Sequence, residues 1–271
     1  MSCFKYSYID RNGRAVIDPG SYQFFHKFSE GVAGVGLEDY QWGFINKNGK
    51  MEISPRFQEV GSFSEGLAAI RLKEKWGFID KTGQVVIKPE YDRANEFSEG
   101  IAVVMKDEET LLIDKTGQVI LSVSQINLEL NVYEHARFSE GLIDAYDPVK
   151  QKYGFIDKAG RFVIEPIFNE AAPFSEGLAR VAIKEEEEKL GFINHRAQFV
   201  IPPIFNTDAD FERNSTDFSE GLASISENLR PTITEAEKFV YIDNNGSIVL
   251  FTDFFYAGPF HYVGVEHEGD Y

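Results

Sequence analysis

Histidine side chains are the ones in this sequence best able to bind a metal or move a proton. The chain has five of them, at positions 26, 135, 195, 261 and 267. Only His261 and His267 lie close together, with Glu266 and Asp270 nearby. These four side chains could bind a cation, but none of the spacings is typical of a metal site. The favoured interpretation is a solvated terminal strand, so we expect no metal site.

Nucleophiles and cofactor motifs are equally sparse. Cys3 is the single cysteine, and no histidine lies near it in the sequence to activate it. The chain has no P-loop, GxGxxG, GxSxG or HExxH motif. Paired carboxylates are abundant among 44 acidic residues, but a glycosidase needs two in one cleft, which sequence alone does not show. We therefore expect no catalytic residue, no cofactor and no enzyme activity.

The charge balance restricts the classes of partner. The 44 acidic residues exceed the 27 basic ones and give a formal net charge of −17. Such a surface repels the phosphates of nucleic acids and of anionic lipids, and it attracts a basic protein. A single cysteine excludes an intrachain disulfide. Because there is neither an apolar run of membrane-spanning length nor an apolar signal core, we expect a cytoplasmic protein without membrane contact.

The tetrapeptide Phe-Ser-Glu-Gly is the most informative feature of the chain, because a catalytic motif would need only one copy. We predict that its phenylalanine anchors the core between repeats, that Ser-Glu forms an exposed turn, and that glycine bends the backbone. The alternative is that the glutamates line an acidic functional stripe. The phenylalanines are Phe28, Phe63, Phe97, Phe138, Phe174 and Phe218, and the glycines are Gly31, Gly66, Gly100, Gly141, Gly177 and Gly221.

A second motif alternates with the first. Its clearest copy is WGFIDKTG at Trp76, and another with tryptophan begins at Trp42. Each copy precedes the next FSEG position by 21 or 28 residues, or by 22 for the first copy. This regular spacing predicts one repeat domain over residues 1–271. Its seven units begin near positions 6, 42, 76, 110, 153, 190 and 239.

One unit is predicted to contain three antiparallel strands. LAAIRL, WGFID and QVVIKP alternate as strands do, with a polar turn at 73–75, a tight turn at 80–83 and a strand end at Pro89. Both faces of these strands carry apolar residues, as in a sheet stacked between two neighbours. The predicted fold is all-β: seven tandem three-stranded antiparallel β-meander repeats stacked into a curved, solenoid-like array. A closed seven-unit, propeller-like ring is the alternative.

The order of these motifs resembles the WG-repeat family of bacterial proteins, also called KWG repeats. The resemblance rests on WGFIDKTGQVVIKPEYDRANEFSEGIAVV at 76–104 and extends over nearly the whole chain. Only two copies keep tryptophan, at Trp42 and Trp76, and the copy at Thr110 has lost the Trp-Gly pair. The resemblance implies a β-rich repeat with an interaction or scaffold role, and it implies no catalytic residue.

Three expansions interrupt the repeat. Two connections are seven residues longer than standard and include residues 122–137 and 206–217, and residues 227–238 lengthen a hairpin tip. Insertions on a repeat scaffold usually lie on one face and often carry binding, although neutral loop growth explains them equally well. The predicted partner-binding residues are Tyr133, His135, Arg137, Phe211, Arg213 and Arg230.

Three functions fit these observations. The first is a noncatalytic protein–protein interaction scaffold, since extended repeat surfaces commonly hold a partner. A narrower version is an immunity or antitoxin protein that neutralises a basic toxin, for which small size and acidity are suitable. The third is a carbohydrate- or small-ligand-binding protein or hydrolase, which would need exposed aromatic rings beside convergent carboxylates.

Overall fold

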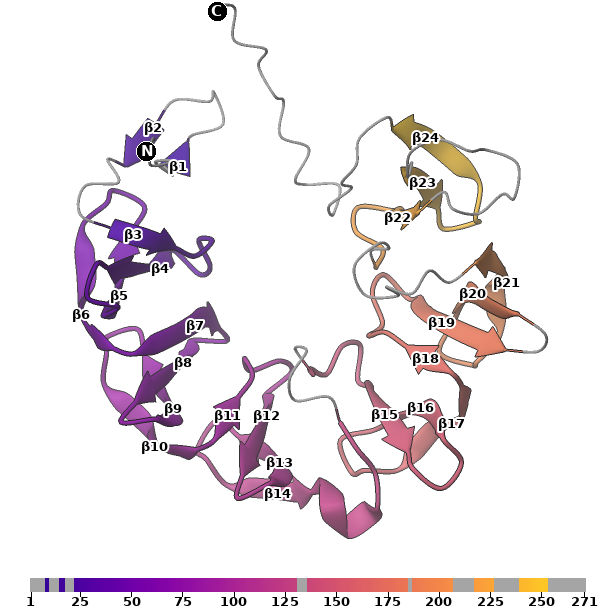
Figure 1. Cartoon of the computed structure of the whole chain (residues 1–271), viewed down its shortest axis with the longest axis horizontal. Helices are drawn as coiled ribbons and strands as arrows, with labels where there is room; N and C mark the ends of the chain where they lie inside the picture. The colour runs from indigo at the N-terminus through magenta and orange to yellow at the C-terminus, as the bar shows by residue number, and fades with distance from the viewer. Residues whose placement is uncertain are drawn as a thin grey trace, which may run out of the picture. The chain divides into compact units, whose positions relative to one another are not determined.

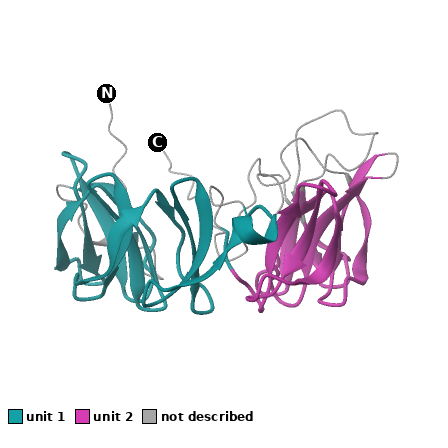
Figure 2. Ribbon diagram, turned by 90° about the horizontal axis from the view of Figure 1, so that it is seen from below, with its two compact units in different colours: residues 1–137 teal, residues 138–271 magenta. Residues whose placement is uncertain are grey.

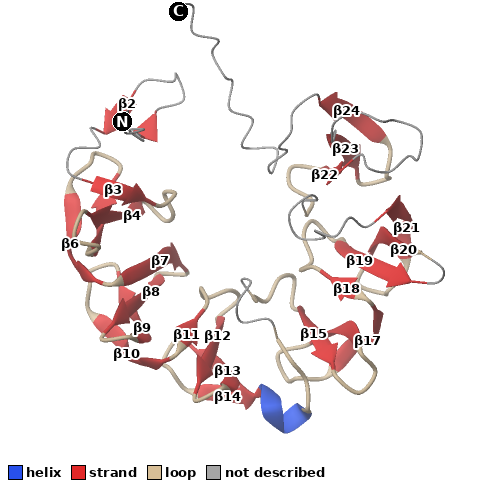
Figure 3. Cartoon of the chain, in the orientation of Figure 1, coloured by secondary structure: helices blue, strands red, loops and turns tan. Residues whose placement is uncertain are grey.

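The computed structural model contains almost only β-structure. It describes residues 8–9, 15–17, 22–130, 136–184, 187–206, 217–226 and 239–252. In these ranges the one helical segment is a single 3₁₀ turn, η1 (Val123–Ile126), and Figure 3 shows it among the strands. No helix of the described residues has the length and hydrophobicity needed to cross a membrane. The chain divides into two compact units, residues 1–137 and 138–271 (Figure 2).

The first unit consists of antiparallel sheets whose strands follow one another in sequence (Figure 1). A two-stranded sheet precedes three four-stranded ones. The strands are β1 (Tyr8–Ile9) and β2 (Ala15–Ile17); β3 (Tyr22–Phe25), β4 (Val32–Leu37), β5 (Trp42–Asn46) and β6 (Met51–Phe57); β7 (Glu59–Ser64), β8 (Leu67–Leu72), β9 (Lys75–Asp80) and β10 (Val85–Tyr91); β11 (Arg93–Ala94), β12 (Ile101–Lys106), β13 (Glu109–Asp114) and β14 (Val119–Ser122).

The second unit has the same sequential antiparallel order in three sheets of three or four strands. Its strands are β15 (Ile143–Asp147), β16 (Lys152–Ile156) and β17 (Phe162–Phe168); β18 (Glu170–Ala171), β19 (Ala179–Lys184), β20 (Glu188–Ile193) and β21 (Phe199–Asn206); β22 (Leu222–Ser226), β23 (Phe239–Asp243) and β24 (Ile248–Thr252).

The three-stranded unit predicted from sequence is too small for four of these sheets. The segment before the FSEG turn adds a further strand, as β7 does by pairing Val60 with Ile70 of β8. The FSEG turn therefore joins two strands of one sheet and does not separate two units. Glu65 and Gly66 have φ angles of 53° and 87°, as the two central residues of a type I′ hairpin turn do.

A glycine and a proline shape the pairing between the last two strands of each regular sheet. A Cβ atom on Gly77 of β9 would lie 2.5 Å from the carbonyl oxygen of Ile87 and 2.6 Å from the nitrogen of Pro89. Only glycine permits this close approach. The pairing of β9 with β10 is irregular there, and the strand continues to Tyr91. The prediction that Pro89 ends the strand is wrong, because the irregularity accommodates a residue without an N–H.

Two sheets lack both members of this pair. Leu111 of β13 and Val240 of β23 occupy the glycine position, and β14 and β24 contain no proline. Val240 pairs directly with Phe251, and its neighbours on both sides pair in step. A side chain at the glycine position thus accompanies regular strand pairing.

The cores lie between consecutive sheets, where pairs of phenylalanine rings meet. The FSEG ring of one sheet packs on a phenylalanine of the preceding sheet, with ring centroids 4.9 Å apart for Phe63 and Phe44 and 4.8 Å for Phe97 and Phe78. In the second unit the same distances are 4.9 Å for Phe174 and Phe155 and 5.0 Å for Phe218 and Phe192. Phe138 is also buried, whereas Phe28 is half-buried.

Candidate interaction surface

Each sheet has two ends with different construction. Because its strands are antiparallel, the FSEG turn and the turn between its last two strands lie at one end, which we call the motif end. The hairpin tips that join β4 to β5, β8 to β9, β12 to β13, β15 to β16, β19 to β20 and β22 to β23 lie at the other end. The connections to the next sheet begin there too, and we call it the variable end. Figure 2 shows turns at both ends of the strands within each unit.

The motif end is held together by hydrogen bonds between successive FSEG turns. In the first unit, the Ser29 hydroxyl donates to the carbonyl oxygen of Phe63 at 2.5 Å, and Ser64 donates to that of Phe97 at 2.6 Å. Ser139 and Ser175 repeat this bond in the second unit. Within each unit, these serines therefore fix the backbone of the following motif.

The glutamate of the motif makes a second link in the same direction. The backbone N–H of Gly100 donates to the Glu65 carboxylate at 3.0 and 3.2 Å, and the Lys115 ammonium lies 3.0 Å from the same carboxylate. Glu30 is held in the same way by Gly66 and Lys81. We call each serine and glutamate pair, with its partners, a clasp.

The clasp recurs in the second unit with different side-chain partners. Glu140 accepts the backbone N–H of Gly177 at 2.9 Å, and His195 takes the place of lysine at 3.2 Å from the carboxylate. Glu176 accepts the N–H of Gly221 at 2.8 Å. The expectation that Ser-Glu is simply an exposed turn is thus incomplete, because these side chains join sheets. Carboxylates bound in this way do not form a free acidic stripe.

The clasps also change the acidity of their carboxyl groups. Burial raises the pKa of Glu65, but hydrogen bonds from Lys115 and from the Gly100 N–H outweigh it and hold the pKa below its ordinary value. The pKa of Glu30 is lowered for the same reasons, with Lys81 and Gly66 as partners. Both groups are therefore ionised anions with structural partners at neutral pH.

All three sequence expansions begin at the variable end. Residues 122–137 follow β14, residues 206–217 follow β21, and residues 227–238 separate β22 from β23. The first is anchored at its start, where Ser122 and Ser124 donate to Glu109, and near its end, where Asn95 donates to the carbonyl oxygen of Ala136 at 3.1 Å. Each insertion therefore begins at the variable end of its own sheet, as expected if that end carries binding.

The structure places one of the six predicted partner-binding residues. Arg137 is exposed, next to the buried Phe138. The other five lie outside the described residues, and their role stays a prediction. They are Tyr133, His135, Phe211, Arg213 and Arg230.

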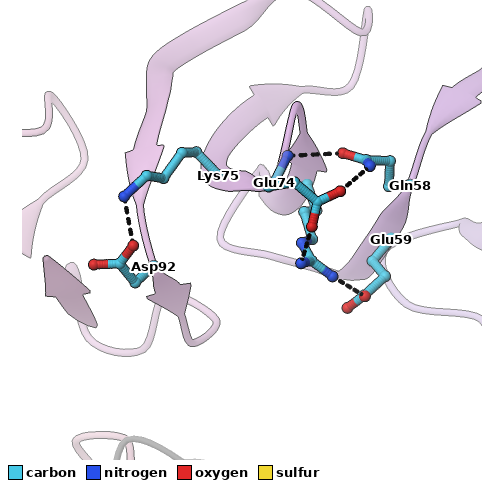
Figure 4. Close-up of polar contacts among 6 residues, drawn as sticks. Gln58, Glu59, Glu74, Lys75 and Asp92 are labelled. Atoms are coloured by element: carbon cyan, nitrogen blue, oxygen red, sulfur yellow. Dashed lines mark hydrogen bonds and ion pairs between the residues drawn. The ribbon is translucent and has the colours of Figure 1, made fainter. Parts of the chain in front are cut away.

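A lattice of polar side chains covers part of the variable end in the first unit (Figure 4). Arg71 binds Glu59 at 2.6 Å and also binds Glu74, whose backbone N–H donates to Gln58 at 3.0 Å. Lys75 lies 2.5 Å from Asp92. These cations are already neutralised by neighbouring carboxylates, so they are poor anion receptors.

Other carboxylates at this end are open to solvent. Glu38, Asp107 and Glu108 are exposed at two hairpin tips. Within the described part of the chain, none of the three forms an ion pair, although Asp107 lies beside Lys106 in sequence. Arg71 and Lys75 are already paired, and the exposed Lys73 is outnumbered by the exposed Glu38, Asp39, Asp107 and Glu108 at the other two tips. The variable end of the first unit therefore presents negative charge to a partner.

An arginine that sequence reasoning missed lies in the second unit, three residues after the FSEG turn that ends at Gly177. Arg180 of β19 is only 6% exposed, and its Nε atom is 3.7 Å from a carboxylate oxygen of Asp217, the last residue of the 206–217 expansion. Burial and the nearby Glu188 raise the pKa of Glu170, against the effect of Arg180. Ala69 and Val103 occupy the Arg180 position in other sheets, and this comparison between repeats was the available signal.

Neither metal ligation nor acid–base catalysis is indicated by the histidines that the structure describes. His195 stacks on Phe174 with ring centroids 4.1 Å apart, and His26 packs on Trp42 at 4.5 Å. Burial lowers the pKa of His26, against the opposing effect of Glu96. Within the described ranges, no group of three or more histidine, cysteine, aspartate or glutamate side chains could hold a metal ion.

A family model decides what kind of repeat this is. The model of the WG containing repeat matches residues 6–40, 42–76, 76–109, 153–185 and 191–228. The chain belongs to the WG-repeat family. Residues 110–152 and 229–271 lie outside the matches and include the two copies that lack the glycine and proline pair. No curated protein matches the chain.

Solved structures share the fold of this WG-repeat chain at low sequence identity. The computationally designed Ika8 protein is similar with a TM-score of 0.50 and 14% identity, over 84% of this chain and 73% of its own. A eukaryotic initiation factor is similar with a TM-score of 0.52 and 11% identity, over 89% of this chain and 68% of its own. At these identities the likeness concerns the fold alone.

Proposed function

We propose that the chain is a noncatalytic scaffold in the cytoplasm that binds a basic protein through the variable end of its sheets. In this proposal seven WG repeats stack into one curved array, whose motif end is closed by clasps. The single observation that carries it is the position of the expansions. All three begin at the variable end, whereas the turns of the motif end are short and bound to one another.

The charge distribution supports a basic partner. Exposed carboxylates at the hairpin tips, such as Asp107 and Glu108, lie beside the connection that bears the 122–137 expansion in the same sheet. Complementary charges raise the rate of association and suppress acidic competitors. Neutralisation of a basic toxin is the special case in which the partner's own activity is blocked.

The test is affinity capture of partners on the full chain, with identification by mass spectrometry and then a binding titration of the purified partner. One variant carries Asp107→Asn and Glu108→Gln. The matched control compares Glu52→Gln with Glu108→Gln alone, since Glu52 is also exposed but lies away from the hairpin tips. A third chain shortens the 122–137 connection by seven residues.

The proposal requires a basic protein that binds the full chain and the Glu52→Gln control equally. Its affinity must fall in the tip variant, fall with added salt, and fall when the connection is shortened. A partner that is acidic, or that binds all of these chains alike, would contradict the proposal, provided that circular dichroism and thermal unfolding show every variant folded.

A further inference from the structure

Two glycines in β4 leave space above the first four-stranded sheet, which neighbouring side chains fill. A Cβ atom on Gly36 would lie 3.0 Å from the Trp42 ring and 3.1 Å from Phe24, and one on Gly34 would lie 3.0 Å from His26. Side chains occupy both positions in the next sheet, as Ala69 and Arg71. The missing side chains allow neighbouring aromatic rings to come together over β4.

Three rings stack beside these glycines, and we call them the aromatic platform. Phe24 of β3 stacks on Trp42 of β5 with centroids 5.8 Å apart and planes 29° apart. Tyr40, in the hairpin tip between β4 and β5, also stacks on Phe24, at 5.5 Å and 29°. Phe24 and Trp42 are half-buried, whereas Tyr40 is 68% exposed. The platform therefore ends in an accessible ring at the variable end.

Tyr40 holds its ring there at a conformational cost. Its φ angle is 60°, in the left-handed region that a bulky side chain rarely adopts. The turn is fixed by the Tyr40 N–H, which donates to Leu37 at 3.0 Å, and by the Gln41 N–H, which donates to the Asp39 carboxylate at 3.3 Å. Strained residues of this kind concentrate at functional sites. The equivalent positions in other hairpin tips carry polar residues in the same conformation, namely Glu74, Glu108 and Gln151.

The surroundings of the platform favour a cation. Glu38 and Asp39 are exposed beside Tyr40 in the same tip. An aromatic face attracts cations through its quadrupole, and adjacent carboxylates add a Coulombic attraction. A guanidinium suits this arrangement best, because it is planar, stacks on aromatic rings and pairs with carboxylates. A neutral sugar would stack on the rings but would gain no Coulombic attraction from the carboxylates.

We propose that the Tyr40 end of the aromatic platform binds an arginine side chain of the partner protein. This inference rests on the proposed function and specifies where a basic partner is anchored. The guanidinium stacks on Tyr40 and pairs with Glu38 or Asp39. Such an anchor resembles the aromatic and arginine pairs that dominate the energetics of many interfaces.

The test uses three synthetic peptides of alternating glycine with arginine, lysine or citrulline. Citrulline keeps the shape of arginine and lacks its charge. Binding to the full chain is measured by calorimetry and by the fluorescence of Trp42, in a chain that also carries Trp76→Phe so that one tryptophan remains. Chitopentaose serves as the neutral sugar probe. Three variants are tested: Tyr40→Phe, Tyr40→Leu, and the double change of Glu38→Gln with Asp39→Asn. The control is Val149→Ala, which changes an exposed apolar residue at a hairpin tip of the second unit.

The arginine peptide is expected to bind and to change the Trp42 fluorescence, and the citrulline peptide is expected to bind at least tenfold more weakly. Tyr40→Leu should weaken binding of the arginine peptide about two- to fivefold, which is the usual size of an exposed cation–π contact. Tyr40→Phe and Val149→Ala should leave it unchanged. The lysine peptide should bind more weakly than the arginine peptide.

Equal binding by Tyr40→Leu and the unchanged chain would overturn the inference, and so would equal binding of the citrulline peptide. If only chitopentaose changes the Trp42 fluorescence, the platform binds sugars and the inference falls. The proposed function is judged separately. It stands if the basic partner still depends on Asp107, Glu108 and the 122–137 connection when Tyr40→Leu has no effect.

Discussion

The carboxylate of Glu65 accepts the backbone N–H of Gly100, a residue 35 positions further along the chain, at 3.0 and 3.2 Å. Both residues belong to FSEG turns of consecutive sheets. The distance in sequence equals about one repeat, so a local motif acts as a long-range contact. This explains why the same four residues recur along the chain: each copy holds the next.

Replacement of Glu65 by alanine should therefore weaken the contact between two sheets. Hydrogen bonds to a charged group stabilise a fold by about 1.5–3 kcal/mol, and partial exposure of this pair reduces the expected loss to roughly 1–2 kcal/mol. Urea unfolding of the full chain measures it. Glu108→Ala, which removes an exposed carboxylate from a hairpin tip, is the control and should change the midpoint little. Equal effects of the two changes would refute the clasp.

The clasps also predict how stability depends on pH. Because the pKa values of Glu30 and Glu65 are lowered in the folded state, the unfolded chain binds more protons in the acidic range. The stabilisation is present above the ordinary value of 4.5 and is lost as the pH falls through the folded pKa values. Thermal unfolding between about pH 3 and 6 should drop less steeply for Glu30→Gln with Glu65→Gln than for the unchanged chain. Parallel curves would show that the clasps do not titrate.

Two glycines should respond differently to alanine. Gly77→Ala places a Cβ atom 2.5 Å from a backbone carbonyl oxygen, which forces two strands apart and should cost about 3 kcal/mol or more. Gly66→Ala meets nothing within 4 Å, so only its φ of 87° matters, at roughly 1 kcal/mol. Urea midpoints of both variants test this order. A milder effect at Gly77 would mean that β10 moves away freely.

Arg180 should stabilise the second unit through its charge. Arg180→Met leaves the carboxylates of Glu170 and Asp217 without the nearby cation and should cost about 2–4 kcal/mol near pH 7.5. Burial and Glu188 already raise the pKa of Glu170, and loss of Arg180 would raise it further. Glu170 can then take up a proton as the pH falls, so the loss should shrink toward pH 5.

Guanidinium unfolding of the Arg180 variant at both pH values gives the comparison. The control is Arg161→Met, since the Arg161 side chain is 78% exposed beside Asp157. It should change stability little at either pH, because exposed ion pairs contribute little. A pH-independent effect at Arg180 would indicate lost packing and no electrostatic role.

The parts of the fold that sequence predicted are those with a local signal. Alternation identified β8, β9 and β10, and the tight turn at 80–83 is confirmed by the Asp80 carboxylate, which accepts the backbone N–H groups of Thr82 and Gln84. The additional strand was missed because β11 and β18 are two residues long, while the longer β3 and β7 pair with register shifts and have no strict alternation of buried and exposed residues. Their pairing depends on the neighbouring strand and not on their own composition.

The candidate surface was only partly accessible to sequence reasoning. The expansions could be located because they break a regular spacing. The aromatic platform could not, because Phe24, Tyr40 and Trp42 meet through the absence of side chains at Gly34 and Gly36, and glycine in a strand gives no sign of what covers it. The clasps were missed because a glutamate in a turn reads as solvated until its partner one repeat away is known.

The clasp has a direction, and this has a consequence for building arrays of such repeats. Ser64 and Glu65 reach toward the following sheet, while the N–H of Gly66 and the carbonyl of Phe63 are taken up by the preceding one. The copies at Phe63 and Phe174 thus bind the following copy on one side and are bound by the preceding copy on the other, like a monomer in a head-to-tail polymer. Duplicated or transplanted units should join seamlessly in the native orientation, and a reversed order of attachment would leave both sides unmatched.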